Sequence, residues 1–264
     1  QCQGDIKTVL QDLLPRVKRG DTAEWLKQVE GYKKKWPLTY AKKGGLHPPQ
    51  VIDALNKLTG GKAIMATDVG QHQMWAWQWY KCDKPWQFIT SGGAGTMGFG
   101  LPAAIGAQFG RPDELVIAIV GDGGFQMTMS DLATAVIHKL PIKIILMNNH
   151  YLGMVRQWQD MFYDERFSQV DLRGNPDFVA LAKSYGMLAL NLKRGADIPK
   201  VLKRALEHPG PALINVEVVM HEEVYPMVPP GKPLEETVLE HPRQKPGRPA
   251  GRKNKPAAAR AKKN

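Results

Sequence analysis

Several classes of protein are excluded by what the sequence lacks. Cysteine is scarce, with only Cys2 and Cys82 in 264 residues, so the chain offers neither a disulfide framework nor the cysteine spacing of a zinc site. No apolar run approaches the roughly 18 residues of a membrane-spanning helix. Residues 1–5 contain no initiator methionine and no basic or apolar leader segment, so we expect no signal peptide and interpret the chain as beginning inside a domain. These absences predict a protein of the reducing cytoplasm, with no membrane partner.

Acidic residues are missing from the last part of the chain, and this explains most of the net charge. The formal charge is +11, and residues 241–264 carry +9 of it, which leaves +2 for the rest. Because the body is nearly neutral, the sequence does not favour nucleic acid as a partner. The tail is rich in proline, glycine, alanine and lysine, a composition that cannot bury a core, and we predict that it is disordered from residue 241.

Two short apolar runs, both rich in β-branched residues, dominate the middle of the chain. The first, Leu115–Val120, is followed by Gly-Asp-Gly-Gly, and the second, Ile142–Met147, is followed by Asn-Asn. Each run predicts a buried strand, and a helix over about 128–138 would connect them as a parallel βαβ unit. Asp122 and Asn149 are therefore expected at the carboxyl ends of neighbouring strands.

Strands and helices alternate over most of the remaining sequence. The pattern predicts a doubly wound, mainly parallel α/β sheet of about six strands with helices on both faces. We divide the chain into the end of a preceding domain with linker helices (1–36), the sheet domain (37–232) and a C-terminal extension (233–264). Helices are expected over residues 5–17, 22–35, 48–58, 99–109 and 197–208, with one more starting at 70 and one ending at 185, and further strands over 63–69, 86–90, 188–192 and 212–218.

The carboxyl ends of the two central strands combine groups that suit a phosphate and a metal ion. Open α/β sheets bind ligands at this edge, and glycines beside Asp122 let the backbone approach a ligand closely. A helix that starts there presents unpaired N–H groups to an anion. The carboxylate of Asp122, the amide oxygen of Asn149 and phosphate oxygens form an all-oxygen set, which suits Mg²⁺ better than zinc. The residues thus predict a metal-bridged phosphate site.

A dinucleotide-binding site is the competing interpretation. Residues 93–98 read Gly-x-Gly-x-x-Gly after an expected strand, and Asp122 would then be the ribose-binding acid. Against it, the preceding strand is short and partly polar, and this interpretation leaves Asn149 without a role. No Gly-x4-Gly-Lys-Ser/Thr sequence is present, which excludes a P-loop nucleotidase.

The Gly-Asp-Gly turn, with Asn148-Asn149 beginning 26 residues after Asp122, resembles the metal and diphosphate motif of thiamine-diphosphate enzymes. From about residue 48 to 231 the chain is similar to the C-terminal, diphosphate-binding domain of the catalytic subunit of acetolactate synthase (acetohydroxyacid synthase). The first 35 or so residues resemble the end of that family's flavin-associated middle domain. Other matching stretches are Gly70–Trp75, Ser91–Gly93, Gly95–Ala107, Leu152–Val155, Gln157-Trp158 and Pro226–Pro229.

The resemblance implies a role for particular residues in binding thiamine diphosphate and Mg²⁺. The metal ligands would be Asp122, Asn149 and the backbone carbonyl of Tyr151. Backbone atoms of Gly95 and Met97 would contact the aminopyrimidine, and the Met97 side chain would hold the cofactor bent. Met97, Met154 and Trp158 would be the catalytic positions, with Trp158 shaping the acceptor pocket. The residues around the diphosphate would be Gln71, His72, Gly123 and Gly124, with Leu152, Gly153 and Met154 beside it.

The resemblance also implies a reaction and partners. The reaction would be decarboxylation of pyruvate and transfer of the two-carbon unit to pyruvate or 2-oxobutyrate, a transferase step of branched-chain amino-acid biosynthesis. In the family, a glutamate on an N-terminal domain of the other subunit activates the cofactor, and we find no match to that domain here. We therefore expect a homodimer or a complementing chain, FAD in the full-length protein, and possible contact with a regulatory subunit.

Two other functions stay open on the sequence. Another thiamine-diphosphate enzyme, such as a glyoxylate carboligase or a pyruvate oxidase, would use the same cofactor site. A non-catalytic fragment that needs a partner chain, or that binds nucleic acid through its tail, is the alternative from a different class.

Overall fold

The structure is a computed structural model that describes residues 3–241. Within these residues the chain forms two compact units, divided between Thr39 and Tyr40. Apart from His241, the tail predicted to be disordered lies outside the described residues. Within residues 3–241, no helix is both long enough and apolar enough to cross a membrane.

The first unit consists of short helices that start close to where the sequence pattern predicts. Asp5 caps the first of them, because its carboxylate accepts a hydrogen bond from the backbone N–H of Thr8 at 3.1 Å. No residue of either α-helix is buried. The elements are α1 (Ile6–Leu13), the 3-10 turn η1 (Leu14–Arg16) and α2 (Ala23–Lys35).

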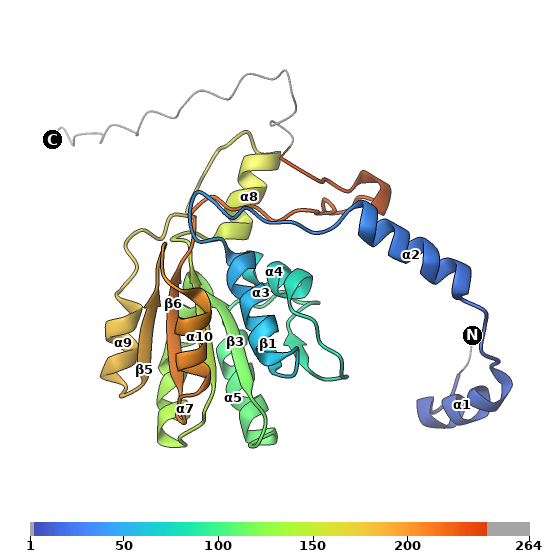
Figure 1. Cartoon of the computed structure of the whole chain (residues 1–264), viewed down its shortest axis with the longest axis horizontal. Coiled ribbons are helices and arrows are strands. Elements are labelled where there is room, and N and C mark those ends of the chain that lie inside the picture. The colour runs from blue at the N-terminus through green and yellow to red at the C-terminus, as the bar shows by residue number, and fades with distance from the viewer. Residues whose placement is uncertain (1–2, 242–264) are drawn as a thin grey trace. The chain divides into compact units, whose positions relative to one another are not determined.

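The second unit is built on one parallel sheet (Figure 1). Its six strands lie in the order β2-β1-β3-β4-β6-β5, and every pair of neighbours is parallel. This arrangement confirms the predicted doubly wound α/β fold. The central strands β3 and β4 are buried along their whole length because helices cover both faces. The strands are β1 (Ile64–Thr67), β2 (Phe88–Thr90), β3 (Val116–Gly121), β4 (Lys143–Asn148), β5 (Leu188–Leu192) and β6 (Ala212–Glu217).

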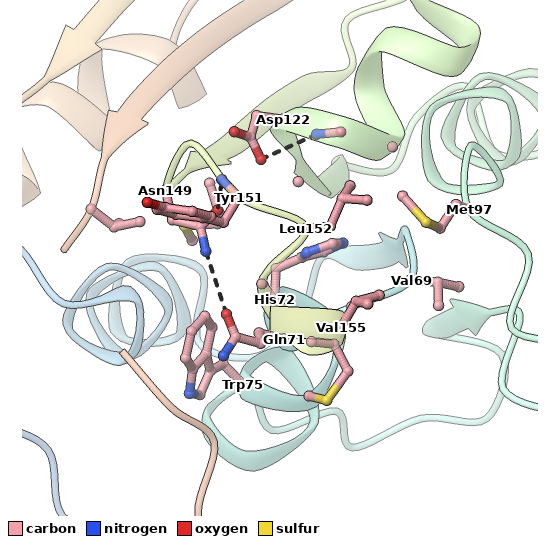
Figure 2. Close-up of a pocket in the computed structure, with 18 residues that line it drawn as sticks. Val69, Gln71, His72, Trp75, Met97, Asp122, Asn149, Tyr151, Leu152 and Val155 are labelled. Atoms are coloured by element: carbon pink, nitrogen blue, oxygen red, sulfur yellow. Dashed lines mark hydrogen bonds between the residues drawn. The ribbon is translucent and has the colours of Figure 1, made fainter. Parts of the chain in front are cut away.

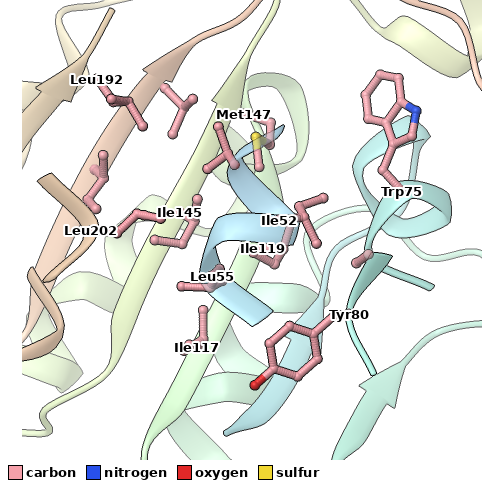
Figure 3. Packing of buried hydrophobic residues seen from close by; sticks show 14 of the residues in the cluster. Ile52, Leu55, Trp75, Tyr80, Ile117, Ile119, Ile145, Met147, Leu192 and Leu202 are labelled. Atoms are coloured by element: carbon pink, nitrogen blue, oxygen red, sulfur yellow. The ribbon is translucent and has the colours of Figure 1, made fainter. Parts of the chain in front are cut away.

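Each face of the sheet has its own apolar core. Alternate residues of β3 point to opposite faces, so Ile117 and Ile119 join one core while Val116 and Ala118 join the other. The first core contains α3 (Pro48–Thr59), α4 (Gln71–Trp79) and α10 (Ile198–Leu206), as Figure 3 shows. The second contains α5 (Gly100–Gly110), α6 (Asp122–Thr128), α7 (Leu132–Ile137) and α9 (Phe178–Ser184). The remaining elements are η2 (Met129–Asp131), α8 (Gly153–Phe162) and η3 (Leu234–Glu236).

The connection between β3 and β4 differs from the single helix predicted over 128–138. A helix begins at once with Asp122, and the 3-10 turn η2 separates it from α7. Apolar spacing located only the later part, because the glycines after Asp122 indicate a turn rather than a helix. Asp122 is therefore the first residue of a helix, directly at the tip of β3.

Lys143 is a charged residue inside the otherwise apolar strand β4. Its side chain is 2% exposed, and its Nζ donates hydrogen bonds to the backbone carbonyls of His208 at 2.5 Å and Gly210 at 2.7 Å. Burial lowers the pKa of Lys143 to about 8. The lysine thus ties the start of β4 to the turn that follows α10.

Candidate functional site

A pocket lies at the carboxyl ends of β1, β3 and β4. β1 pairs with β2 on one side and with β3 on the other. The strand order therefore runs toward one edge of the sheet from β1 to β2 and toward the other edge from β3 to β4. Ligands bind open α/β sheets at such positions. Figure 2 shows Asp122, Asn149 and Tyr151 together at one end of the pocket, with Val69 and Met97 at the other. The pocket therefore has a polar end and an apolar end.

Asp122 is the acidic group at the polar end. It is 1% exposed, and its carboxylate accepts hydrogen bonds from the backbone N–H of Gly123 at 3.1 Å and the side-chain amide of Asn175 at 2.7 Å. Burial raises the pKa of Asp122 to about 6, although these two hydrogen bonds lower it. The ionised carboxylate is thus poorly compensated, and a cation beside it would stabilise it.

Asn149 follows the neighbouring strand and is held by two hydrogen bonds. Gly121 pairs with Met147 in the sheet, so the residues after them end side by side. The Oδ1 of Asn149 accepts the backbone N–H of Tyr151 at 3.1 Å, and its Nδ2 donates to Gln71 Oε1 at 3.4 Å. Because an amide oxygen has two lone pairs, Oδ1 retains one for a ligand.

His72 contributes a buried polar atom that has no partner within the described protein. Its ring is 7% exposed, and its Nε2 makes no hydrogen bond. Burial lowers the pKa of His72 to about 4, so the imidazole is neutral at pH 7. Since buried polar atoms are nearly always paired, a polar ligand atom beside His72 would satisfy it.

Gly153 allows α8 to begin against the polar end of the pocket. A Cβ at this position would lie 2.1 Å from Gln71 Oε1 and 2.7 Å from Asn149 Nδ2, which is closer than real side-chain contacts. The first residues of α8 and of α4 line the pocket. Both helices therefore direct unpaired N–H groups and the positive ends of their dipoles toward it, which favours an anion.

The structure brings together most of the residues that the sequence singled out, although their roles stay predictions. Gly95 does not line the pocket and lies in an exposed turn, where a Cβ would sit 3.9 Å from Val69. Trp158 does not line it either and is 38% exposed on α8. The residues that do line it are Gln71, His72, Met97, Asp122, Gly123, Gly124, Asn149, Tyr151, Leu152, Gly153 and Met154.

The sequence did not identify several residues that support the pocket through hydrogen bonds. Asn175 is one of them, because its side-chain amide donates a hydrogen bond to Asp122. Asp68, which is 1% exposed, accepts the backbone N–H groups of Val69 and Gly98, both at 2.8 Å, and so fixes the segment before α5. No local pattern marks Asn175, whereas Asp68 lies just after β1, where polar residues gather.

Gln157 is the most extensively bonded of the missed residues. It is 1% exposed on α8, and its Oε1 accepts from Gln71 Nε2 at 2.9 Å and from the backbone N–H of Val224 at 3.0 Å. Its Nε2 donates to the carbonyl of Val224 at 3.1 Å. Gln157 therefore fastens α8 both to Gln71 in the pocket and to the segment after β6.

Replacing Gln157 by leucine is expected to destabilise the chain and to loosen the pocket. The change leaves the N–H and C=O of the fully buried Val224 unpaired, at a cost of about 2–4 kcal/mol in free energy of unfolding, because each unsatisfied buried group costs about 1–3 kcal/mol. Urea unfolding followed by circular dichroism measures the difference.

Gln159→Leu is the matched control in the same helix. The Gln159 amide pairs with the backbone of Ser168 in a solvent-exposed position, so water can replace the lost bonds and the loss should stay below about 1 kcal/mol. Equal losses in the two variants would contradict the role given to Gln157.

The polar and apolar groups that line the pocket determine which ligands it can bind. A carboxylate, an amide oxygen and nearby backbone carbonyls suit a hard divalent cation such as Mg²⁺. Two helix starts and an unpaired imidazole suit an anion, and the apolar end suits a flat organic group. The pocket is therefore equipped for a metal-bridged anion attached to an organic ring.

Comparison with known proteins adds a family match. Residues 68–216 match the family model described as thiamine pyrophosphate enzyme, C-terminal TPP binding domain. This range begins directly after β1 and includes β3, β4 and all residues of the polar end of the pocket.

Curated relatives cover most of the chain. The acetolactate synthase large subunit of Cyanidium caldarium is 43% identical over 86% of this chain and 40% of its own length. The large subunit of Lactococcus lactis is 45% identical over 90% of this chain and 41% of its own length. The mitochondrial acetolactate synthase of Schizosaccharomyces pombe is 41% identical over 88% of this chain and 35% of its own length. The chain thus spans about two fifths of the length of these relatives.

Proposed function

Because the chain belongs to the thiamine pyrophosphate enzymes, through their C-terminal TPP binding domain, we propose that it is the cofactor-binding part of an acetolactate synthase. The observation that carries the proposal is the polar end of the pocket, where Asp122 and Asn149 follow adjacent parallel strands and His72 has an unpaired buried nitrogen. A carboxylate, an amide and an imidazole thus line the same pocket.

The residues present fit Mg²⁺ and a diphosphate. Asp122, the Oδ1 of Asn149 and the backbone carbonyl of Tyr151 would hold the ion. Gln71, His72, Gly123 and Gly124 would surround the diphosphate, with Leu152 and Gly153 beside it. The unpaired Nε2 of His72 and the poorly compensated carboxylate of Asp122 support this assignment, since each would gain a partner.

The apolar end of the pocket suits the organic part of thiamine diphosphate. Met97 lies at this end, and Met154 also lines the pocket. We assign to Met97 the support that keeps the cofactor bent, to Met154 a place beside the cofactor, and to Gly95 a backbone contact with the aminopyrimidine. The coenzyme supplies the carbanion chemistry when bound. The task of these side chains is to position it and to exclude water.

The proposed substrates are 2-oxo acids. Pyruvate would be decarboxylated, and its two-carbon unit would be transferred to a second pyruvate or to 2-oxobutyrate, a step of branched-chain amino-acid biosynthesis. Trp158 would border the acceptor. We assign the protein to the cytoplasm from its scarce cysteines, of which Cys82 is unpaired.

Further domains complete the proposed enzyme. We propose that residues 1–36 end a flavin-associated domain, that 37–232 form the cofactor domain, and that 233–264 are an extension. A homodimer partner or a complementing chain would supply the activating glutamate, and FAD would bind outside this chain. A regulatory subunit is a further proposed partner.

Product analysis tests the proposed function. The chain is mixed with a chain carrying the N-terminal domain of a relative, together with thiamine diphosphate, Mg²⁺ and pyruvate, and we expect acetolactate to form only in the complete mixture. Acetate or acetyl phosphate would indicate a pyruvate oxidase, and consumption of glyoxylate a glyoxylate carboligase. Cofactor binding without any product would support a non-catalytic fragment. The matched relatives bear the acetolactate synthase name, which disfavours these alternatives.

The acceptor preference gives a residue-level prediction. Trp158→Ala is expected to lower the preference for 2-oxobutyrate over pyruvate by about 10-fold or more, because one methylene in an apolar pocket is worth roughly 1–3 kcal/mol. Competition between the two acceptors, with both products quantified, measures it. Phe162→Ala is the control, since Phe162 lies on the same helix and is 42% exposed. A ratio that is unchanged by Trp158→Ala would remove Trp158 from the acceptor site.

A further inference from the structure

Three metal-ligand side chains from distant parts of the sequence meet outside the pocket. Asp160 lies near the end of α8, Glu223 follows β6, and His241 is the last described residue. One ligand atom of each lies within 4.8 Å of the others, and within residues 3–241 this is the one group of at least three such side chains. None of the three belongs to the proposed cofactor site.

The separations suit a single shared ion. The Nε2 of His241 lies 3.4 Å from Asp160 Oδ1 and 3.9 Å from Glu223 Oε1. Metal–nitrogen and metal–oxygen bonds are about 2.0–2.2 Å, so two ligands of one ion lie up to about 4.4 Å apart. The side chains are also largely shielded, with exposures of 11%, 16% and 12% for His241, Asp160 and Glu223.

Each carboxylate presents one oxygen to the cluster and keeps the other for an outer contact. Tyr225 donates its hydroxyl proton to Glu223 Oε2 at 2.7 Å, and Arg156 lies 3.9 Å from Asp160 Oδ2. Outer contacts of this kind orient the ligands of protein metal sites. The other oxygen of each carboxylate, Oδ1 of Asp160 and Oε1 of Glu223, faces His241.

The path of the chain explains how His241 returns to this place. Met227 and Val238 form an antiparallel bridge, with backbone hydrogen bonds of 2.9 Å and 2.8 Å. Met227 is buried, so the pair anchors the segment on the domain. The three residues after Val238 then reach the end of α8.

We propose that Asp160, Glu223 and His241 form a second, transition-metal site, selective for a divalent ion such as Zn²⁺. One imidazole and two carboxylates form the mixed nitrogen–oxygen set that suits zinc, whereas the all-oxygen cofactor pocket suits Mg²⁺. The two carboxylates lie close together, and an ion between them would offset their repulsion. The ion would fasten the C-terminal segment to α8, whose first turn lines the pocket.

Zinc binding to the full 264-residue chain tests the site. The chain is titrated with Zn²⁺ in competition with a chromophoric chelator, and Co²⁺ substitution reports the geometry by visible absorption. Asp122→Ala serves as the background, so that the cofactor pocket does not contribute. We expect one bound Zn²⁺ in this background, and a further His241→Ala change should weaken binding by about 100-fold or more, since even outer-contact residues are worth about 10- to 100-fold. His208→Ala, which removes an imidazole outside the cluster, should bind as tightly as the background.

Tyr225→Phe provides a second, milder test that does not touch a ligand. It removes only the hydroxyl that orients Glu223, so we expect about a 10-fold weaker affinity with unchanged circular dichroism. Two results would overturn the proposal: no stoichiometric Zn²⁺ in the background variant, which would leave an ion-pair cluster, or binding that survives His241→Ala, which would mean an adventitious ion only. Loss of Zn²⁺ binding leaves the proposed function untouched, because that function depends on Asp122 and Asn149.

Discussion

Asp122→Asn is expected to abolish the rise in melting temperature that thiamine diphosphate with Mg²⁺ gives the chain in the presence of its partner domain. Asparagine keeps the shape of the side chain and one oxygen that can accept the hydrogen bond from Asn175, so the change removes the charge and one of the two acceptor oxygens. Removing one partner of a buried charge pair costs about 2–5 kcal/mol of binding. A ligand at 100 times its dissociation constant stabilises a protein by about 2.7 kcal/mol, so the loss should erase the shift.

The same variant should not destabilise the ligand-free chain. Since burial raises the pKa of Asp122 to about 6, the folded protein holds a proton there more tightly than the unfolded chain does. The stabilisation linked to this proton is present at acid pH and is lost as the pH rises through about 6. At pH 7 the ionised carboxylate is therefore unfavourable, and removal of this charge should offset the lost acceptor oxygen, so that the asparagine variant stays about as stable as the wild type.

Thermal unfolding with and without Mg²⁺ and cofactor separates these effects. Asp113→Asn is the control, because Asp113 is exposed in the turn before β3 and should leave the shift intact. If Asp122→Asn retained the full shift, the metal would have to be held elsewhere.

Gly100→Ala is expected to cause the largest loss of stability among single methyl additions in α5. A Cβ on Gly100 would lie 2.5 Å from the backbone nitrogen and 2.9 Å from the Cα of Asp68. Backbone atoms of a buried strand end cannot rotate away, so the helix must shift. Overpacking of this kind costs typically about 1–3 kcal/mol, and we expect about 3 kcal/mol or more here.

Gly106→Ala in the same helix is the matched control. Nothing lies within 4 Å of a Cβ at Gly106, and alanine favours a helix over glycine by roughly 0.5–1 kcal/mol. Relative to the wild type, Gly100→Ala should therefore lower the urea midpoint of unfolding, whereas Gly106→Ala should raise it. A stable Gly100→Ala protein would show that α5 and Asp68 are not in close contact.

Asp122 and Asn149 could be identified from sequence because each follows its own buried strand, and the ends of neighbouring parallel strands must meet. Nothing local identifies Asn175 or Gln157 as their supports. The hydrogen bond from Asn175 spans 53 residues, and that from Gln71 to Gln157 spans 86, so only the fold reveals them. Lys143 was likewise hidden, since a strand pattern gives no sign that carbonyls of a distant turn will receive a charge.

Two residues that the sequence singled out for the site do not line the pocket. Gly95 and Trp158 were singled out by resemblance alone, and neither lines the pocket in this chain. The contacts proposed for them involve a cofactor or a substrate, which the packing of the chain alone does not reveal. The Gly-x-Gly-x-x-Gly of residues 93–98 follows β2, an edge strand of three residues, rather than the strand at the switch of direction, which disfavours a dinucleotide site there.

The buried position of Lys143 has a consequence for covalent labelling. An amine enclosed by two carbonyls cannot meet an acylating reagent while the fold is closed. Its modification would therefore occur only during excursions that separate β4 from the turn after α10. The rate at which Lys143 is acylated, followed by mass spectrometry, would therefore report how often the centre of the sheet opens. Exposed lysines would react without this delay.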